Sequence, residues 1–138
     1  MGEGYAELRI CEVPSLVDLR RAIDLLIYLS VAVGIVLLPQ LYMLVPLWLF
    51  LSVLVGWLAY FAVAVLATVG RSVAYPLAFV LSILTLAVSL PQPEHYSYVS
   101  AGLSLASSTF VVGSVLQVFL LVLIPIYLYR KRRSSRQI

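Results

Sequence analysis

Few residues of this chain could do chemistry, and they do not converge. The sequence holds a single histidine, His95, and the residue directly before it is an acid, Glu94. A neighbouring carboxylate and imidazole could begin a metal site, but two side chains supply too few ligands and adjacent residues rarely converge on one ion. With Tyr96 and Tyr98 they could also serve a surface enzyme, although no further converging group completes such a site. We therefore expect a non-catalytic protein without metal or cofactor.

Further function classes lack the residues that they need. No acidic, basic or histidine residue lies deep inside a long apolar stretch, Asp24 being near the end of the first. Ion-coupled carriers generally place such a group within the membrane, so coupled transport is disfavoured. The one cysteine, Cys11, allows no disulfide redox chemistry within the chain. The basic residues show no interleaved aromatics, so we expect no nucleic-acid partner.

The elements that would position any site are four apolar stretches. The chain has 138 residues, of which 63% are hydrophobic and 11% are charged, and its mean hydropathy is +1.08. About 20 apolar residues cross a bilayer as a helix, so this length suffices for four crossings and little else. The fold class predicted is an all-α integral membrane protein, a single membrane domain over 1–138 with four transmembrane helices in two hairpins. The spans predicted are 22–38, 46–69, 72–90 and 104–129.

The basic residues define the orientation of these spans. All nine lie before the first stretch, between the second and third, or after the fourth. The connections 39–45 and 91–103 contain no Lys or Arg. The positive-inside rule then places both termini in the cytoplasm, as in a multi-pass protein of the cell membrane. The basic residues are Arg9, Arg20, Arg21, Arg71, Arg130, Lys131, Arg132, Arg133 and Arg136.

Local signals suggest where the elements begin and end. Ser15 followed by Asp18 resembles a capping box, which predicts an amphipathic helix that leaves the cytoplasmic segment 1–21 and runs into the first span. Pro39 is expected to end that span, because proline lacks an N–H and its ring clashes with the preceding turn. Pro46 suits the first turn of the second helix. The tail 130–138 would bind anionic lipid headgroups through Arg130, Lys131, Arg132 and Arg133.

Small residues mark the expected helix-packing faces. Ser52 and Gly56 form a small-xxx-small pair, for which packing within the chain is a likelier use than dimerisation. A larger face in 100–114 is the best interface candidate, because small side chains let helix backbones approach closely. Gln117 is the one amide near mid-membrane, and its desolvation cost predicts a hydrogen-bond partner on another helix. The large face consists of Ser100, Gly102, Ser104, Ala106, Ser108 and Gly113.

Two functions fit these features. The first is a small accessory or assembly subunit that packs in the bilayer with other membrane proteins or with copies of itself, since its spans are uncharged and it has almost no soluble mass. The alternative is an oligomeric channel or carrier for a neutral or apolar solute, with Gln117 lining the path, because such a pore needs no buried charge.

Overall fold

The structure, a computed structural model, describes residues 14–93, 96, 100 and 105–137. Four long helices make up this part of the chain, and no strand occurs in it. The helices are α1 (Leu16–Leu44), α2 (Leu47–Thr68), α3 (Ala74–Ser89) and α5 (Leu105–Arg136). Three of them, α1, α2 and α5, are long and apolar enough to cross a membrane. The 16 residues of α3 reach about 24 Å as a helix, which is less than the ~30 Å of a hydrocarbon core.

Helix α1 begins where the sequence predicts and ends later. The Ser15 Oγ accepts a hydrogen bond from the backbone N–H of Asp18 at 3.2 Å, which confirms Ser15 as the N-cap. The prediction that Pro39 ends the span was wrong, because the helix continues through Pro39 to Leu44. Packing against neighbouring helices makes proline tolerable inside a membrane helix. Pro39 leaves the Ile35 carbonyl oxygen without its helical donor, and Gln40 Nε2 donates at 2.7 Å to the next carbonyl oxygen, that of Val36.

The connections and the last helix also refine the expected boundaries. Between α1 and α2 only Val45 and Pro46 remain outside the helices, so the connection is a tight turn. Between α2 and α3, Gly70 adopts φ +80°, a conformation that side chains with a Cβ rarely take. Helix α5 includes Pro125 and continues to Arg136, so most of the basic tail is a helical extension of the fourth element.

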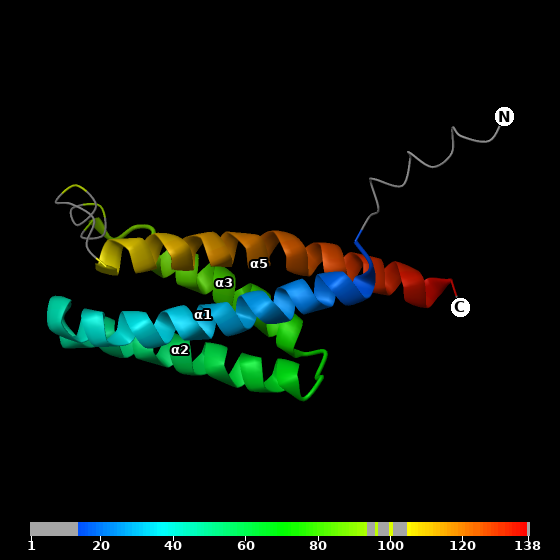
Figure 1. Cartoon of the computed structure of the whole chain (residues 1–138), viewed down its shortest axis with the longest axis horizontal. Helices are drawn as coiled ribbons and strands as arrows, with labels where there is room; N and C mark the ends of the chain where they lie inside the picture. Colours follow the sequence, from blue (N-terminus) through cyan, green and yellow to red (C-terminus); the bar gives the residue numbers. More distant parts are fainter. Residues whose placement is uncertain (1–13, 94–95, 97–99, 101–104, 138) are drawn as a thin grey trace.

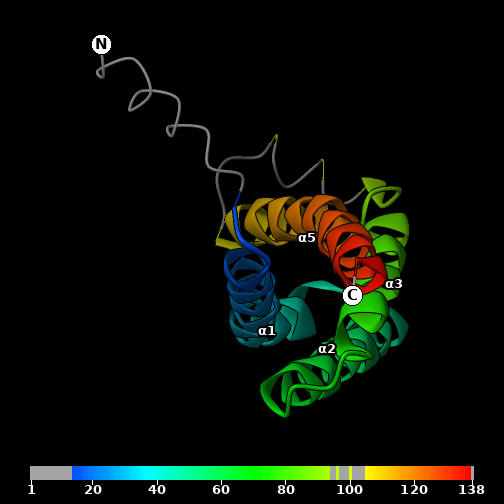
Figure 2. The ribbon, with the colours of Figure 1, turned by 90° about the vertical axis from the view of Figure 1, so that its right-hand side faces the viewer.

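The four helices form a ring. Helix α1 packs against α2, α2 against α3, α3 against α5 and α5 against α1, and the view along the bundle shows them around a common centre (Figure 2). The start of α1, the α2–α3 turn and the end of α5 lie together at one end of the bundle (Figure 1). We name this the basic end, and the opposite one the far end. The described basic residues at the basic end are Arg20, Arg21, Arg71, Arg130, Lys131, Arg132, Arg133 and Arg136.

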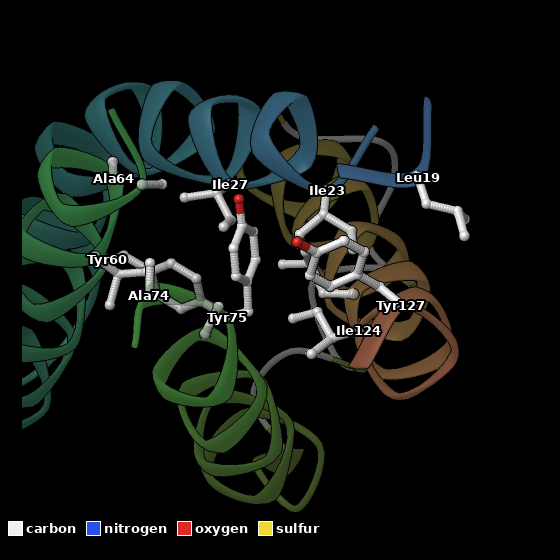
Figure 3. Close-up of a cluster of buried hydrophobic side chains, with 13 residues drawn as sticks. Leu19, Ile23, Ile27, Tyr60, Ala64, Ala74, Tyr75, Ile124 and Tyr127 are labelled. Atoms are coloured by element: carbon white, nitrogen blue, oxygen red, sulfur yellow. The ribbon is translucent and has the colours of Figure 1, made fainter. Parts of the chain in front are cut away.

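Large side chains fill the half of the bundle next to the basic end. Ile23 and Ile27 from α1 and Ile124 from α5 are completely buried. The rings of Tyr75 and Tyr127 meet with their centroids 5.0 Å apart, and Figure 3 shows these side chains pointing into the space between the helices. Because lipid offers no hydrophobic drive for helix association, close packing of this kind holds a membrane bundle together.

Polar contacts also join the helices near the basic end. Tyr75 Oη donates to Asp24 Oδ1 at 3.1 Å, so α3 is tied to α1 across the bundle. Arg20 Nε lies 3.9 Å from Asp24 Oδ2, which gives the carboxylate a cationic neighbour on its own helix. At the helix ends, Arg130 Nη1 donates to the Pro14 carbonyl oxygen at 2.8 Å. The start of α1 and the end of α5 are thereby joined.

Candidate binding cavity

Four polar side chains, one from each helix, meet near the middle of the bundle. Tyr60 of α2 donates from its hydroxyl to Gln117 Oε1 of α5. The same hydroxyl lies 2.8 Å from Ser82 Oγ of α3, and Gln117 Nε2 donates to Ser30 Oγ of α1 at 3.4 Å. Tyr60, Ser82 and Gln117 are almost completely buried. We name these four residues the polar cluster, and it contains the partner on another helix that the sequence predicts for Gln117.

The hydrogen-bond donors and acceptors around Gln117 determine which way its side-chain amide points. Ser30 Oγ donates its single proton to the Leu26 carbonyl oxygen at 2.8 Å, so toward Gln117 it is an acceptor. The amide nitrogen must therefore face Ser30, and the amide oxygen must face Tyr60. An amide nitrogen carries two N–H groups, and within the described part of the chain only the Ser30 oxygen accepts from it. Among the described residues, the second N–H of Gln117 therefore has no acceptor, although Gln117 is only 5% exposed.

A cavity extends from the polar cluster toward the far end. Its volume is about 430 Å³, within the range of small-molecule sites, and all four helices line it. On α5 the lining runs from Gln117 to Ser107, ten residues or ~15 Å of helix. Most lining side chains are apolar, and none of the described lining residues is charged. The cavity thus has apolar walls and, at mid-bundle, an uncharged hydrogen-bonding floor.

Two glycines shape the cavity in different ways. A Cβ added to Gly56 would meet nothing within 4 Å, so no neighbouring helix closes on α2 at this point. Gly34 has the opposite role, because a Cβ there would lie 2.1 Å from Trp57 Cδ1. The indole occupies this space, and Trp57 Nε1 donates to the Val31 carbonyl oxygen at 3.0 Å. Gly34 therefore leaves room for the indole of Trp57 against α1, where Trp57 forms part of the cavity wall.

The packing residues predicted from the sequence divide into two groups. Ser52 and Gly56 line the cavity, and a Cβ added to Gly56 would meet nothing within 4 Å, so the use of this pair in helix packing stays a prediction. Gly113 packs against α1, since a Cβ at this position would lie 3.8 Å from Val33 Cγ1. Ser108 is half-buried and lies in a shallow groove between α1 and α5. Of the described members of the small-residue face, Gly113 therefore packs inside the bundle, whereas Ser108 lies in this groove and Ser100 is exposed.

Some predicted positions lie outside the described residues. These are Arg9, Cys11, Glu94, His95, Tyr98, Gly102 and Ser104, together with the side chain of Ala106. Ser100 is helical and exposed, and it interacts with another residue. Within the described residues no three His, Cys, Asp or Glu side chains gather in a way that could hold a metal ion.

The basic side chains near the end of α5 have different surroundings. Arg130 is engaged with Pro14, and Lys131 Nζ lies 6.0 Å from the centroid of the Tyr127 ring. Arg132 and Arg133 are exposed on the last turns of the helix. Their binding to lipid headgroups remains a prediction.

Sequence reasoning missed that Ser30, Tyr60 and Ser82 belong with Gln117, although a signal was present. In an antiparallel hairpin, residues equally far from the turn lie at the same depth. Ser30 and Tyr60 are each 15 residues from Val45, and Tyr60 and Ser82 are each 11 residues from Arg71. Polar residues at matched depths in consecutive spans therefore predict a shared layer.

Comparison with known proteins adds no relative. The chain matches no protein-family model, no curated protein and no solved structure. What it does has to be inferred from its own geometry.

Proposed function

We propose that this chain is a multi-pass membrane protein that binds or carries a neutral, largely apolar solute inside its own helix bundle. The observation that carries the proposal is the cavity of about 430 Å³, which has apolar walls, a hydrogen-bonding floor and no charged lining residue in the described chain. A cavity with few convergent polar groups is the usual form of a small-molecule site. Because Gln117 faces the inside of one bundle, one copy of the chain suffices, whereas the sequence had suggested a path between several copies.

The same proposal includes the membrane topology. Helix α3 crosses the bilayer with the other three, because it packs between α2 and α5 and its flanking residues Val73 and Leu90 keep helical backbone angles. The basic end faces the cytoplasm of a cell membrane, since cationic side chains are retained on that side. Arg132 and Arg133 then lie where anionic headgroups would bind them.

Tryptophan fluorescence tests the proposed binding. The chain has two tryptophans, of which Trp57 lines the cavity and Trp48 is 63% exposed on the outside of α2. In lipid nanodiscs, Trp48→Phe leaves Trp57 as the reporter, and Trp57→Phe leaves Trp48. A dibromoalkane of about ten carbons should quench Trp57 with a saturable dependence on its concentration in the lipid. It should quench Trp48 in proportion to concentration, without saturation.

A cavity-filling variant provides the control. Gly56→Leu adds bulk where a Cβ meets nothing, so it should remove the saturable quenching while the bundle still folds. Val65→Phe adds bulk to the same helix at a residue that is 47% exposed and outside the cavity lining, so it should leave the quenching unchanged. Unsaturable quenching of Trp57 in the parent protein would refute the binding function.

A second proposal, association with other membrane proteins, has weaker support. The α1–α2 turn presents large apolar side chains at the far end, with Met43 83%, Leu47 66% and Tyr42 60% exposed. Apolar surface at the membrane boundary is covered either by lipid or by protein. Purification from the native membrane in a mild detergent would test it, because a lone monomer without companions would contradict the subunit role.

A further inference from the structure

The cavity is not equally closed on all sides. Its lining residues on α1 and α5 are mostly shielded, as Leu41, Ser107 and Gln117 are 7%, 5% and 5% exposed. Its lining residues on α2 and α3 include exposed ones, with Val55 at 65% and Leu84 at 54%.

Exposed lining residues concentrate on neighbouring helices, so the described part of the cavity opens sideways between α2 and α3. In a membrane this opening faces the hydrocarbon of the bilayer, because Val55 and Leu84 belong to apolar stretches of their helices. A molecule dissolved in the bilayer could therefore reach the floor without crossing water.

The floor selects among such molecules through the spare donor of Gln117. One amide N–H of Gln117 has no acceptor within the described chain, and burying a donor without a partner is unfavourable. An oxygen of a ligand could satisfy it. The hydroxyl protons of the other three members are already donated: that of Ser30 to the Leu26 carbonyl oxygen, that of Ser82 to the Ala78 carbonyl oxygen, and that of Tyr60 to Gln117 Oε1.

Resting on the proposed binding function, we infer that the cavity takes a bilayer-dissolved carbonyl compound. It enters between α2 and α3, and its carbonyl oxygen accepts a hydrogen bond from Gln117. A carbonyl group fits because its oxygen accepts a hydrogen bond and it has no donor of its own. The floor of the cavity offers the unpaired N–H of Gln117. An ionised headgroup does not fit, since no described lining residue would compensate its charge.

The chemical part is tested with two probes of equal length, a dibrominated methyl ketone and the matching dibromoalkane. In the Trp48→Phe protein, both should quench Trp57 saturably, and the ketone should bind about three- to tenfold more tightly, as expected for one net hydrogen bond. Gln117→Leu should abolish that preference while the alkane still binds. Saturable binding of both probes with equal affinity would overturn the carbonyl assignment and leave the binding function intact. Failure of both probes to bind would refute the binding function itself, and this inference with it.

The route is tested by stopped-flow mixing with the ketone. Val55→Phe and Leu84→Phe narrow the lateral opening, so each should slow the association rate by about tenfold. Ile35→Phe is the matched control, since Ile35 is 57% exposed on α1 and does not line the cavity. Association rates equal in all three variants would overturn lateral access between α2 and α3.

Discussion

The hydrogen bond between Tyr60 and Gln117 is expected to be the strongest single polar link between the helices of this bundle. Tyr60→Phe removes the hydroxyl that donates to Gln117 Oε1 and contacts Ser82 Oγ at 2.8 Å. Loss of one partner from a buried pair leaves the other unsatisfied, which costs about 1–3 kcal/mol of unfolding free energy. Hydrogen bonds between membrane helices measured by double-mutant cycles average about 0.6 kcal/mol and reach about 1.7 kcal/mol. We expect the upper part of that range, because both side chains are about 95% shielded.

The assay is a double-mutant cycle with Tyr60→Phe and Gln117→Leu, followed by reversible unfolding in mixed micelles. The coupling energy should be about 1.5 kcal/mol. The control cycle uses Tyr28→Phe and Thr68→Val, since their hydroxyls lie 2.8 Å apart on α1 and α2 at an exposed position and Thr68 also bonds to a backbone carbonyl. Its coupling should be about 0.5 kcal/mol or less. A Tyr60–Gln117 coupling no larger than that of the control would refute the assignment of the polar cluster as a structural centre.

Further predictions concern glycines and topology. Gly34→Ala should destabilise the bundle by about 1–3 kcal/mol and shift the Trp57 emission, because the indole must leave its position on α1. Gly70→Ala should lower the unfolding free energy by about 1–2 kcal/mol, since alanine is strained at φ +80°, and Trp57 emission should stay unchanged. In a cysteine-free background, single cysteines at Met43 and Ser135 should react with an impermeant maleimide from opposite sides of the membrane; labelling from one side would contradict the four-span topology.

Much of the fold follows from local signals in the sequence. The cap at Ser15 depends on residues three positions apart, and the apolar stretches depend on composition over about twenty residues, so both can be recognised without tertiary information. The end of α1 could not be placed in this way. Proline removes a single backbone donor, and a helix that is packed in a bundle can continue through it, as α1 does from Leu16 to Leu44.

The cavity was less accessible to sequence reasoning than the helices were. Gly34, Gly56 and Gly113 look alike as small residues, yet one receives an indole, one faces open space and one touches a valine. Which of these occurs depends on the rotation of each helix about its axis, and this is decided by packing across the whole bundle. The role of Gln117 was predictable because a buried amide must find partners, but the identity of those partners required the relative depth of all four helices.

The uneven filling of the bundle has a mechanical consequence. Isoleucine and tyrosine side chains bind the four helices firmly at one end, and the turn at Gly70 joins α2 to α3 there. Any widening between these two helices must therefore pivot about that turn, with the displacement growing toward Leu49 and Val88. A bound molecule could then separate α2 from α3 at the far end and leave the cavity while the packed half of the bundle stays folded.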